Sequence, residues 1–465
     1  MGGTNLPLGA DAGDCLDILA QSPLVYIYTQ ITLCFSVPEA SAHPTIINTL
    51  TTGLERLATS FPWVAAQVVN DAGVNKFRPF ERTPRLVVKD LSQDASMPTM
   101  ADLREARFPA RMLDESRIAP RMTLPGAPGE GPGDPTPVFL VQATFITGGL
   151  LLTLVGNHGT MDMVGQAQVM RLLSKACRNE PFTSEELSSG NLPRLDLVPL
   201  LEDSYDPTPE VAHQIIKPKP PVQADSGAAG ERTETFAPPG SFWAYFIFSR
   251  SSLTSLKSLA TEAVTDPPGF VSTDDALTAF VWQSVVRARR PRLDPSARPQ
   301  MTRAVDVRHF LHVPDTYPGM IQNLTYHQSS LQDLVKSPLG LIASRLRTAV
   351  DPRTSNLAHA TRALAMYISR AEDRNLVSLT ADINGSVDIT PSSWVKIDCY
   401  AMDFGLELGL PEAVRRPKFL PCEGLMYFMP RAPNGEVALL LCLREDDMER
   451  LKADEEFTKH AEYVG

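Results

Sequence analysis

The chain has 465 residues, of which 43% are hydrophobic and 21% charged, and its formal net charge at pH 7 is −11. This acidic balance, with no run of basic residues, argues against nucleic acid or an anionic membrane as a partner. Because single hydrophobic cores rarely grow past about 250–300 residues, the length predicts two domains.

The first half of the sequence predicts a strand, a helix and a hairpin. Residues 23–37 are rich in β-branched and aromatic types and predict a strand, and residues 44–60 carry leucine and isoleucine at helical spacing. The region 91–137 is rich in loop-forming residues. Two apolar runs, Val138–Ile146 and Leu150–Asn157, flank a short glycine turn and predict a hairpin.

The hairpin runs directly into His158, and a helical pattern begins after Asp162. We therefore expect His158 at a strand-to-helix junction, a place from which side chains often face a cleft.

A stretch rich in proline, glycine, serine and charge, residues 203–240, predicts the main domain boundary. We expect an N-terminal domain over 1–215, a crossover linker over 216–240 and a C-terminal domain over 241–465. Alternating strands and helices in both halves predict an α/β fold. In the C-terminal half we expect strands over 242–248, 391–399 and 424–429, helices from 252 and over 273–289 and 445–460, and an Asn434-Gly435 hairpin turn between 425–430 and 437–443.

Four segments carry side chains suited to chemistry. His158-x-x-x-Asp162 could hold a base, but the spacing is common and a structural histidine explains it equally well. Ser272-Thr273 precedes a helix and fits either an N-cap or a donor to phosphate or pantetheine. Asp403-Phe404-Gly405 reads as a turn, and Ser392-Ser393-Trp394 as part of a strand. The chain contains no Gly-x-Ser-x-Gly elbow, phosphate-binding loop or zinc helix.

Taken together, the first, third and fourth of these segments resemble the BAHD-type acyltransferases, and among them the fungal trichothecene 3-O-acetyltransferases. The resemblance runs nearly end to end. Further stretches that carry it are Ile27–Ile31, Pro62–Ala65, Asp162–Gln166, Leu172–Asn179, Val271–Leu277 and Leu425–Pro430.

The resemblance implies two chloramphenicol-acetyltransferase-like domains, each a mixed β-sheet with flanking helices, and an active-site tunnel between them. In this family pattern His158 is the catalytic base. Asp162 has a structural role, because it points away from the substrate and pairs with Arg308.

Other positions that match the family pattern lie toward the coenzyme. Asp403 and Gly405 correspond to a motif that shapes the domain interface. Two residues depart from that motif, since Leu406 stands where tryptophan is usual and Glu407 where the fungal pattern favours glycine. The residues implied on the coenzyme side are Ser272, Thr273, Ser392 and Ser393.

The implied reaction transfers an acetyl group from acetyl-CoA to a hydroxyl of a sesquiterpenoid alcohol, namely the C3 hydroxyl of a trichothecene. A neutral histidine suits the removal of the hydroxyl proton at pH 7. Two alternatives stay open. One is an acyltransferase for another fungal alcohol or amine, and the other is a non-catalytic binding protein of the same fold.

We expect acetyl-CoA as a co-substrate and no tightly bound cofactor. The six cysteines show no Cys-x-x-Cys spacing, so no zinc site is expected. Because no basic segment with an apolar run opens the chain and no apolar stretch reaches about 18 residues, we expect a cytoplasmic protein without a membrane span. We also expect a monomer.

Overall fold

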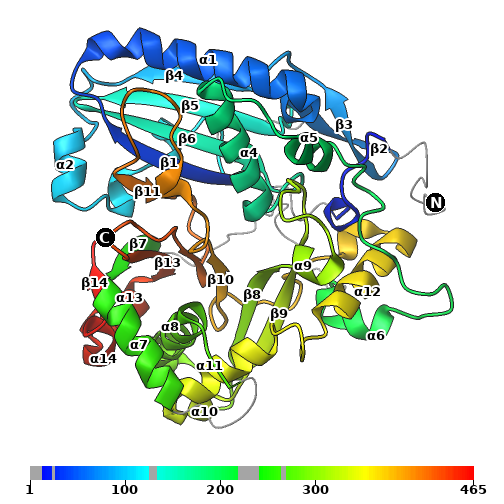
Figure 1. Ribbon diagram of the computed structural model, residues 1–465. Coiled ribbons are helices and arrows are strands. Elements are labelled where there is room, and N and C mark those ends of the chain that lie inside the picture. Colours follow the sequence, from blue (N-terminus) through cyan, green and yellow to red (C-terminus); the bar gives the residue numbers. More distant parts are fainter. Residues whose placement is uncertain (1–12, 23–26, 125–133, 218–239, 263–268) are drawn as a thin grey trace, which may run out of the picture.

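The computed structural model describes residues 13–22, 27–124, 134–217, 240–262 and 269–465. Within these residues the strands form two five-stranded sheets and two hairpins. Figure 1 shows the two sheets one above the other, with helices on their outer sides.

The first sheet has the strand order β11-β1-β6-β5-β4, and all of its pairs are antiparallel except β4 with β5. Every residue of β5 and β6 is buried, because both strands are mainly apolar and lie in the centre of the sheet. Helices α1 (His43–Ser60) and α4 (Met163–Cys177) pack on one face (Figure 1). The strands are β1 (Tyr28–Ser36), β4 (Arg85–Asp90), β5 (Phe139–Ile146), β6 (Gly149–Asn157) and β11 (Ala413–Arg415).

The second sheet has the order β10-β12-β13-β7-β14. Successive side chains of a strand point to opposite faces, and β7 divides its side chains accordingly. Phe246 and Phe248 pack among the helices over 250–262, 273–289 and 339–348, whereas Trp243 and Tyr245 join the core shared with the first sheet. The strands are β7 (Ser241–Phe248), β10 (Thr390–Ser393), β12 (Leu425–Phe428), β13 (Val437–Arg444) and β14 (Ala461–Tyr463).

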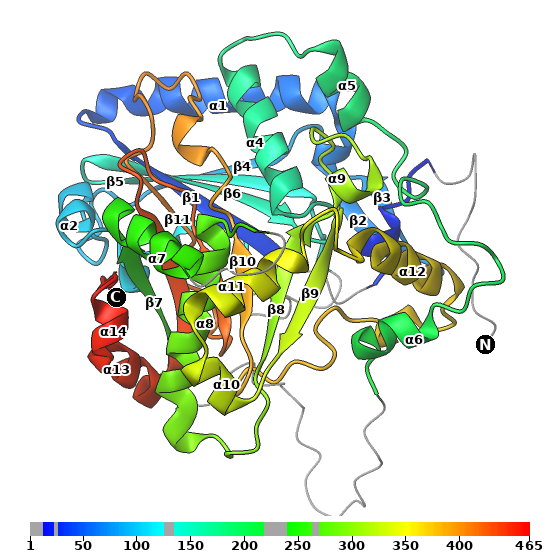
Figure 2. The same cartoon turned by 60° about the horizontal axis from the view of Figure 1, so that its bottom comes forward.

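Two hairpins complete the strands, β2 (Ala66–Asp71) with β3 (Val74–Pro79), and β8 (Gln300–Asp306) with β9 (Gln322–Gln328). A bridge between Met301 and Ile389 places β8 beside the start of β10, as Figure 2 shows. The other helices are α2 (Met100–Glu105), α3 (Glu115–Ile118), α5 (Ser184–Gly190), α6 (Thr208–Val211), α7 (Arg250–Glu262), α8 (Thr273–Arg289), α9 (Arg308–Leu311), α10 (Leu331–Lys336), α11 (Leu339–Thr348), α12 (Leu357–Arg370), α13 (Glu445–Ala453) and α14 (Glu455–Thr458).

A segment from the C-terminal half belongs to the first sheet. Strand β11 pairs with β1, with Leu33 opposite Val414. Just before it, Phe404 and Leu406 are buried in the core that also holds α1 and α4. The Asp403-Phe404-Gly405 motif therefore packs on the sheet that carries His158, although 245 residues separate the two along the chain.

The predicted hairpin is confirmed by β5 and β6, and the helices over 44–60 and 273–289 by α1 and α8. Two of the predicted elements extend beyond those in the structure. The strand over 391–399 ends at Ser393, and the helix over 445–460 is split into α13 and α14 at Asp454. Most of the expected linker, 218–239, lies outside the described residues. No helix in the described ranges has the length and apolar character needed to cross a membrane.

Candidate active site

His158 lies at the end of β6, immediately before the turn that leads into α4. The last strand residue, Asn157, is opposite Tyr28 of β1. The His158 N–H donates to the Ile27 carbonyl at 2.8 Å, and the Gly159 N–H donates to Asn157 Oδ1 at 2.9 Å. These bonds fix the backbone of the turn and direct the imidazole away from the sheet into a cavity.

The hydrogen bonding of the His158 ring determines which nitrogen can act as a base. Nδ1 lies 3.2 Å from the carbonyl oxygen of Met161. Because a carbonyl oxygen can only accept a hydrogen bond, the proton of the neutral ring belongs on Nδ1. Nε2 therefore keeps its lone pair.

The cavity that His158 lines has a volume of about 320 Å³ and is walled by both halves of the chain. Most of its lining is apolar, and within the described part of the chain no Asp, Glu, Lys or Arg contributes to it. The polar side chains in the wall are Ser22, Thr29, His158, Gln322, Ser378, Thr380, Thr390 and Ser392. The larger apolar ones are Leu19, Ile27, Leu124, Met163, Leu324, Leu364, Ile368, Leu379, Trp394, Leu425 and Tyr427.

Burial lowers the pKa of His158 below its ordinary value, because the charged imidazolium loses hydration. The charge of Asp162 opposes this shift, and the charge of Arg416 adds to it. The imidazole is consequently neutral at pH 7, the form in which Nε2 can accept a proton.

Asp162 caps helix α4 and has no free oxygen for chemistry. Its Oδ1 accepts from the Gly165 N–H at 2.8 Å, and its Oδ2 accepts from the Ile321 N–H at 2.8 Å. Arg308 donates to both oxygens, at 3.1 Å to Oδ1 and 2.8 Å to Oδ2. The ion pair that the resemblance implied is therefore present, and it is buried on both sides.

Arg308 ties the His158 turn to the loop before β9. Besides Asp162 and Asp306, its guanidinium donates to the carbonyls of Tyr317 at 3.0 Å and Gly319 at 2.7 Å. The loop approaches α4 so closely that a Cβ on Gly165 would lie 2.5 Å from the Pro318 carbonyl oxygen. The base and this loop are thus held in one rigid arrangement.

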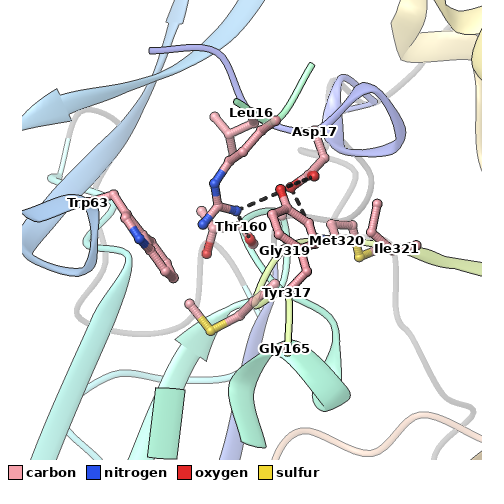
Figure 3. Close-up of polar contacts among 12 residues, drawn as sticks. Leu16, Asp17, Trp63, Thr160, Gly165, Tyr317, Gly319, Met320 and Ile321 are labelled. Carbon is pink, nitrogen blue, oxygen red and sulfur yellow. Dashed lines mark hydrogen bonds and ion pairs between the residues drawn. The ribbon is translucent and has the colours of Figure 1, made fainter. Parts of the chain in front are cut away.

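A second buried acid–arginine pair, which the sequence did not reveal, holds the same loop from the other side. Asp17 accepts from the Tyr317 hydroxyl at 2.6 Å and from the Met320 N–H at 3.0 Å (Figure 3). Arg194 bridges Asp17 at 3.2 Å and the carbonyl of Thr160, in the His158 turn, at 2.9 Å. Burial raises the pKa of Asp17, and Arg194 opposes that shift.

The residues expected on the coenzyme side gather around the N-terminus of α8, except for Ser392. Ser272 is the N-cap of α8 and forms a capping box with Asp275. Ser393 donates to Asp274 at 2.6 Å, which brings β10 against this helix end, and Thr273 is the first helical residue. Ser392 lines the cavity and accepts from Trp394 Nε1 at 3.0 Å.

Asp403 and Gly405 contact the C-terminal end of α4. Asp403 Oδ1 accepts from the Gly405 N–H at 2.7 Å, and the Asp403 carbonyl accepts from Ser174 Oγ at 2.5 Å and from Arg178. Gly405 has a φ of +63°, the left-handed region that glycine adopts without strain. Glu407 has a φ of +61° as well, which explains why the fungal pattern favours glycine there.

Arg416, another residue that no local pattern indicated, is a buried cation behind the cavity wall. Its side chain is fully enclosed, and its hydrogen bonds to the Gln30 carbonyl and Thr123 Oγ1 are long, at 3.3 and 3.4 Å. The guanidinium carbon lies 4.5 Å from the ring centre of Tyr427 and 4.6 Å from that of Phe419. Its Nε has no hydrogen-bond partner among the described residues.

Two family models match the chain. A model for the trichothecene 3-O-acetyltransferase-like N-terminal domain matches residues 27–177, and a model for the transferase family matches residues 123–458.

Several curated proteins are similar over almost their whole length. The O-acetyltransferase dmxR13 of a Cryptosporiopsis species and the trichothecene 3-O-acetyltransferase TRI101 of Fusarium sporotrichioides are each 51% identical, over 97% of this chain and 97% of their own. A trichothecene 3-O-acetyltransferase of Saccharomyces cerevisiae is 44% identical over 97% of this chain and 96% of its own.

Solved structures agree with these matches. The F. sporotrichioides TRI101 complex with coenzyme A and T-2 is 49% identical, with a TM-score of 0.89 over 97% of this chain and 99% of that one. Vinorine synthase, 15% identical with a TM-score of 0.65 over 99% of this chain and 96% of that one, shares the fold.

Proposed function

Because the chain belongs to the transferase family and carries the trichothecene 3-O-acetyltransferase-like N-terminal domain, we propose that it acetylates the C3 hydroxyl of a trichothecene. The family and its relatives make it an acyl-CoA-dependent O-acetyltransferase with a two-domain, chloramphenicol-acetyltransferase-like α/β fold. The names of its relatives support the choice of acceptor and position.

The observation that carries the proposal is the orientation of His158 in the cavity. Its Nδ1 lies within hydrogen-bond distance of the Met161 carbonyl, which makes Nε2 the basic nitrogen of the neutral ring. In the proposed reaction Nε2 removes the hydroxyl proton as the acceptor oxygen attacks the thioester carbonyl. The tetrahedral intermediate collapses to the acetate ester and CoA thiolate, which takes the proton back from the imidazolium.

The other site residues have supporting roles in this proposal. Asp162 and Arg308 hold the turn that presents His158. The Asp162 carboxylate accepts hydrogen bonds from two backbone N–H groups and from Arg308, so its contacts position the chain and do not leave it available as a base. In the proposed reaction Ser392, which lines the cavity, faces the acyl group, and Ser272 and Ser393, which lie beside the start of α8, border the path of the coenzyme.

The lining of the cavity favours a neutral alcohol over an amine. A substrate ammonium would lose its hydration in a mainly apolar cavity whose described lining offers no carboxylate, at a cost of several kcal/mol. Another fungal alcohol remains the second candidate, because the O-acetyltransferase dmxR13 is as similar as the trichothecene enzyme of Fusarium.

A cytoplasmic location is part of the proposal. All six cysteines are free thiols, four of them buried, as is usual for proteins of reducing compartments.

The test is a thiol-release assay with acetyl-CoA and a trichothecene that bears a free C3 hydroxyl, with mass spectrometry of the product. We expect stoichiometric CoA and 3-O-acetyl ester. The same trichothecene already acetylated at C3 is the control acceptor and should release no thiol. Rapid acetylation of the control, or none of the free alcohol, would refute the choice of the C3 hydroxyl.

A further inference from the structure

Gln322 is the first residue of β9 and faces the cavity. Gln322 and Leu324 both line it, as expected for alternate residues of one strand, and Ala304 lines it from the neighbouring β8. Asn323, between them, points the other way and donates to Thr361 Oγ1 of α12 at 3.0 Å. The strand geometry therefore directs the Gln322 amide toward whatever occupies the cavity.

The Gln322 amide is free, whereas several polar neighbours in the wall are engaged. Ser22 Oγ donates to the Val377 carbonyl at 2.5 Å, and Ser378 Oγ and Thr380 Oγ1 share a hydrogen bond at 3.2 Å. Throughout the described ranges, no group hydrogen-bonds the Gln322 side chain. A primary amide has two N–H donors and one acceptor oxygen, so it can bind an ether, epoxide, carbonyl or hydroxyl oxygen.

The backbone that leads into Gln322 is fixed by the same contacts that fix the base. The Ile321 N–H donates to Asp162 Oδ2 at 2.8 Å, and the Met320 N–H to Asp17 at 3.0 Å. Figure 3 shows this loop passing beside Asp17. Asp162 is four residues after His158, so one carboxylate sets the position of both the base and the start of β9.

We propose that Gln322 is a specificity-determining residue that hydrogen-bonds an oxygen of the acceptor other than the hydroxyl that His158 deprotonates. This inference rests on the proposed function and extends it. It states that the acceptor is a neutral alcohol with at least one further oxygen placed to meet Gln322. A monohydric alcohol of equal size lacks that contact and leaves the amide unpaired in a mainly apolar cavity.

The test compares wild type with Gln322→Leu, which removes the donors and acceptor at similar volume. The probes are a trichothecene with a free C3 hydroxyl and a monohydric polycyclic alcohol of similar size. We expect kcat/KM for the trichothecene to fall about 10-fold or more. The KM for acetyl-CoA and the rate with the monohydric alcohol should stay within twofold of wild type.

Gln328→Leu, the same substitution at the exposed end of the same strand, is the matched control and should change none of these values. If Gln322→Leu does not fold, Gln322→Ala, which also removes the donors and the acceptor, supplies the comparison. Unchanged trichothecene kinetics, or an equal loss with both alcohols, would overturn the role of Gln322 while leaving the acetyltransferase activity intact. A wild-type enzyme inactive with both alcohols would instead overturn the proposed function, and this inference with it.

Discussion

Replacing Asp162 by asparagine separates the structural role of this residue from acid–base chemistry. Asparagine keeps the size of the side chain and an oxygen that can cap α4 at Gly165. It removes the negative charge opposite Arg308, whose exposed fraction is 0%. Breaking a buried ion pair by removing one partner costs about 3–5 kcal/mol, a large part of the roughly 5–15 kcal/mol that stabilises a typical protein.

The assay is denaturant unfolding at pH 7 together with kcat/KM as a function of pH. We expect a clearly lower unfolding midpoint and a retained acid limb. That limb should move to lower pH, because the Asp162 charge raises the pKa of His158 and is lost in the variant. Replacing Arg308 by methionine as well should recover part of the stability, since the fully buried guanidinium is then gone and the carboxylate that it leaves behind, that of Asp306, is partly exposed to solvent. A native midpoint combined with the loss of the acid limb would refute the structural role.

Four further predictions follow from the site. His158→Ala should lower kcat by about 10²–10⁴-fold while calorimetric CoA binding is kept, and near-wild-type turnover would exclude His158 as the base. In wild type, the midpoint of the acid limb of kcat/KM should lie below the ordinary histidine pKa of about 6.5, because burial lowers the pKa of His158. Arg416→Gln removes a nearby positive charge that lowers the pKa of His158, so the acid limb should move to higher pH. Arg416→Lys keeps the charge and should stay close to wild type. An unmoved limb in the glutamine variant would show that the Arg416 charge does not affect the pKa of His158. Gly165→Ala forces the loop at Pro318 away from α4, so it should lower the free energy of unfolding by about 1–3 kcal/mol and also lower kcat. A melting temperature equal to that of wild type would mean that the loop moves aside without cost.

The sequence predicted the parts of the site that local patterns encode. The apolar hairpin before His158 and the helical spacing after Asp162 place the base at its junction, and the structure has it there. The Asp162–Arg308 contact joins residues 146 positions apart, so no periodicity reports it, and it came from the family resemblance alone.

Contacts that depend on the tertiary fold left no trace in the sequence. Asp17 and Tyr317 are 300 residues apart, and each looks like an ordinary polar residue in its own segment. Gln322 resembles any polar strand residue until its neighbours show that it faces a cavity. Strand β11 is three residues long, too short for an alternating pattern to stand out.

The placement of β11 has a consequence for biosynthesis. Residues 28–36 and 149–157 leave the ribosome early, but the strand that covers Thr32–Cys34 consists of residues 413–415. Until residues 413–415 have been synthesised, that stretch of β1 is an open sheet edge. Such an edge can pair with strands of other chains. We expect the isolated fragment 1–217 to aggregate, and the nascent protein to need protection at this edge until translation is nearly complete.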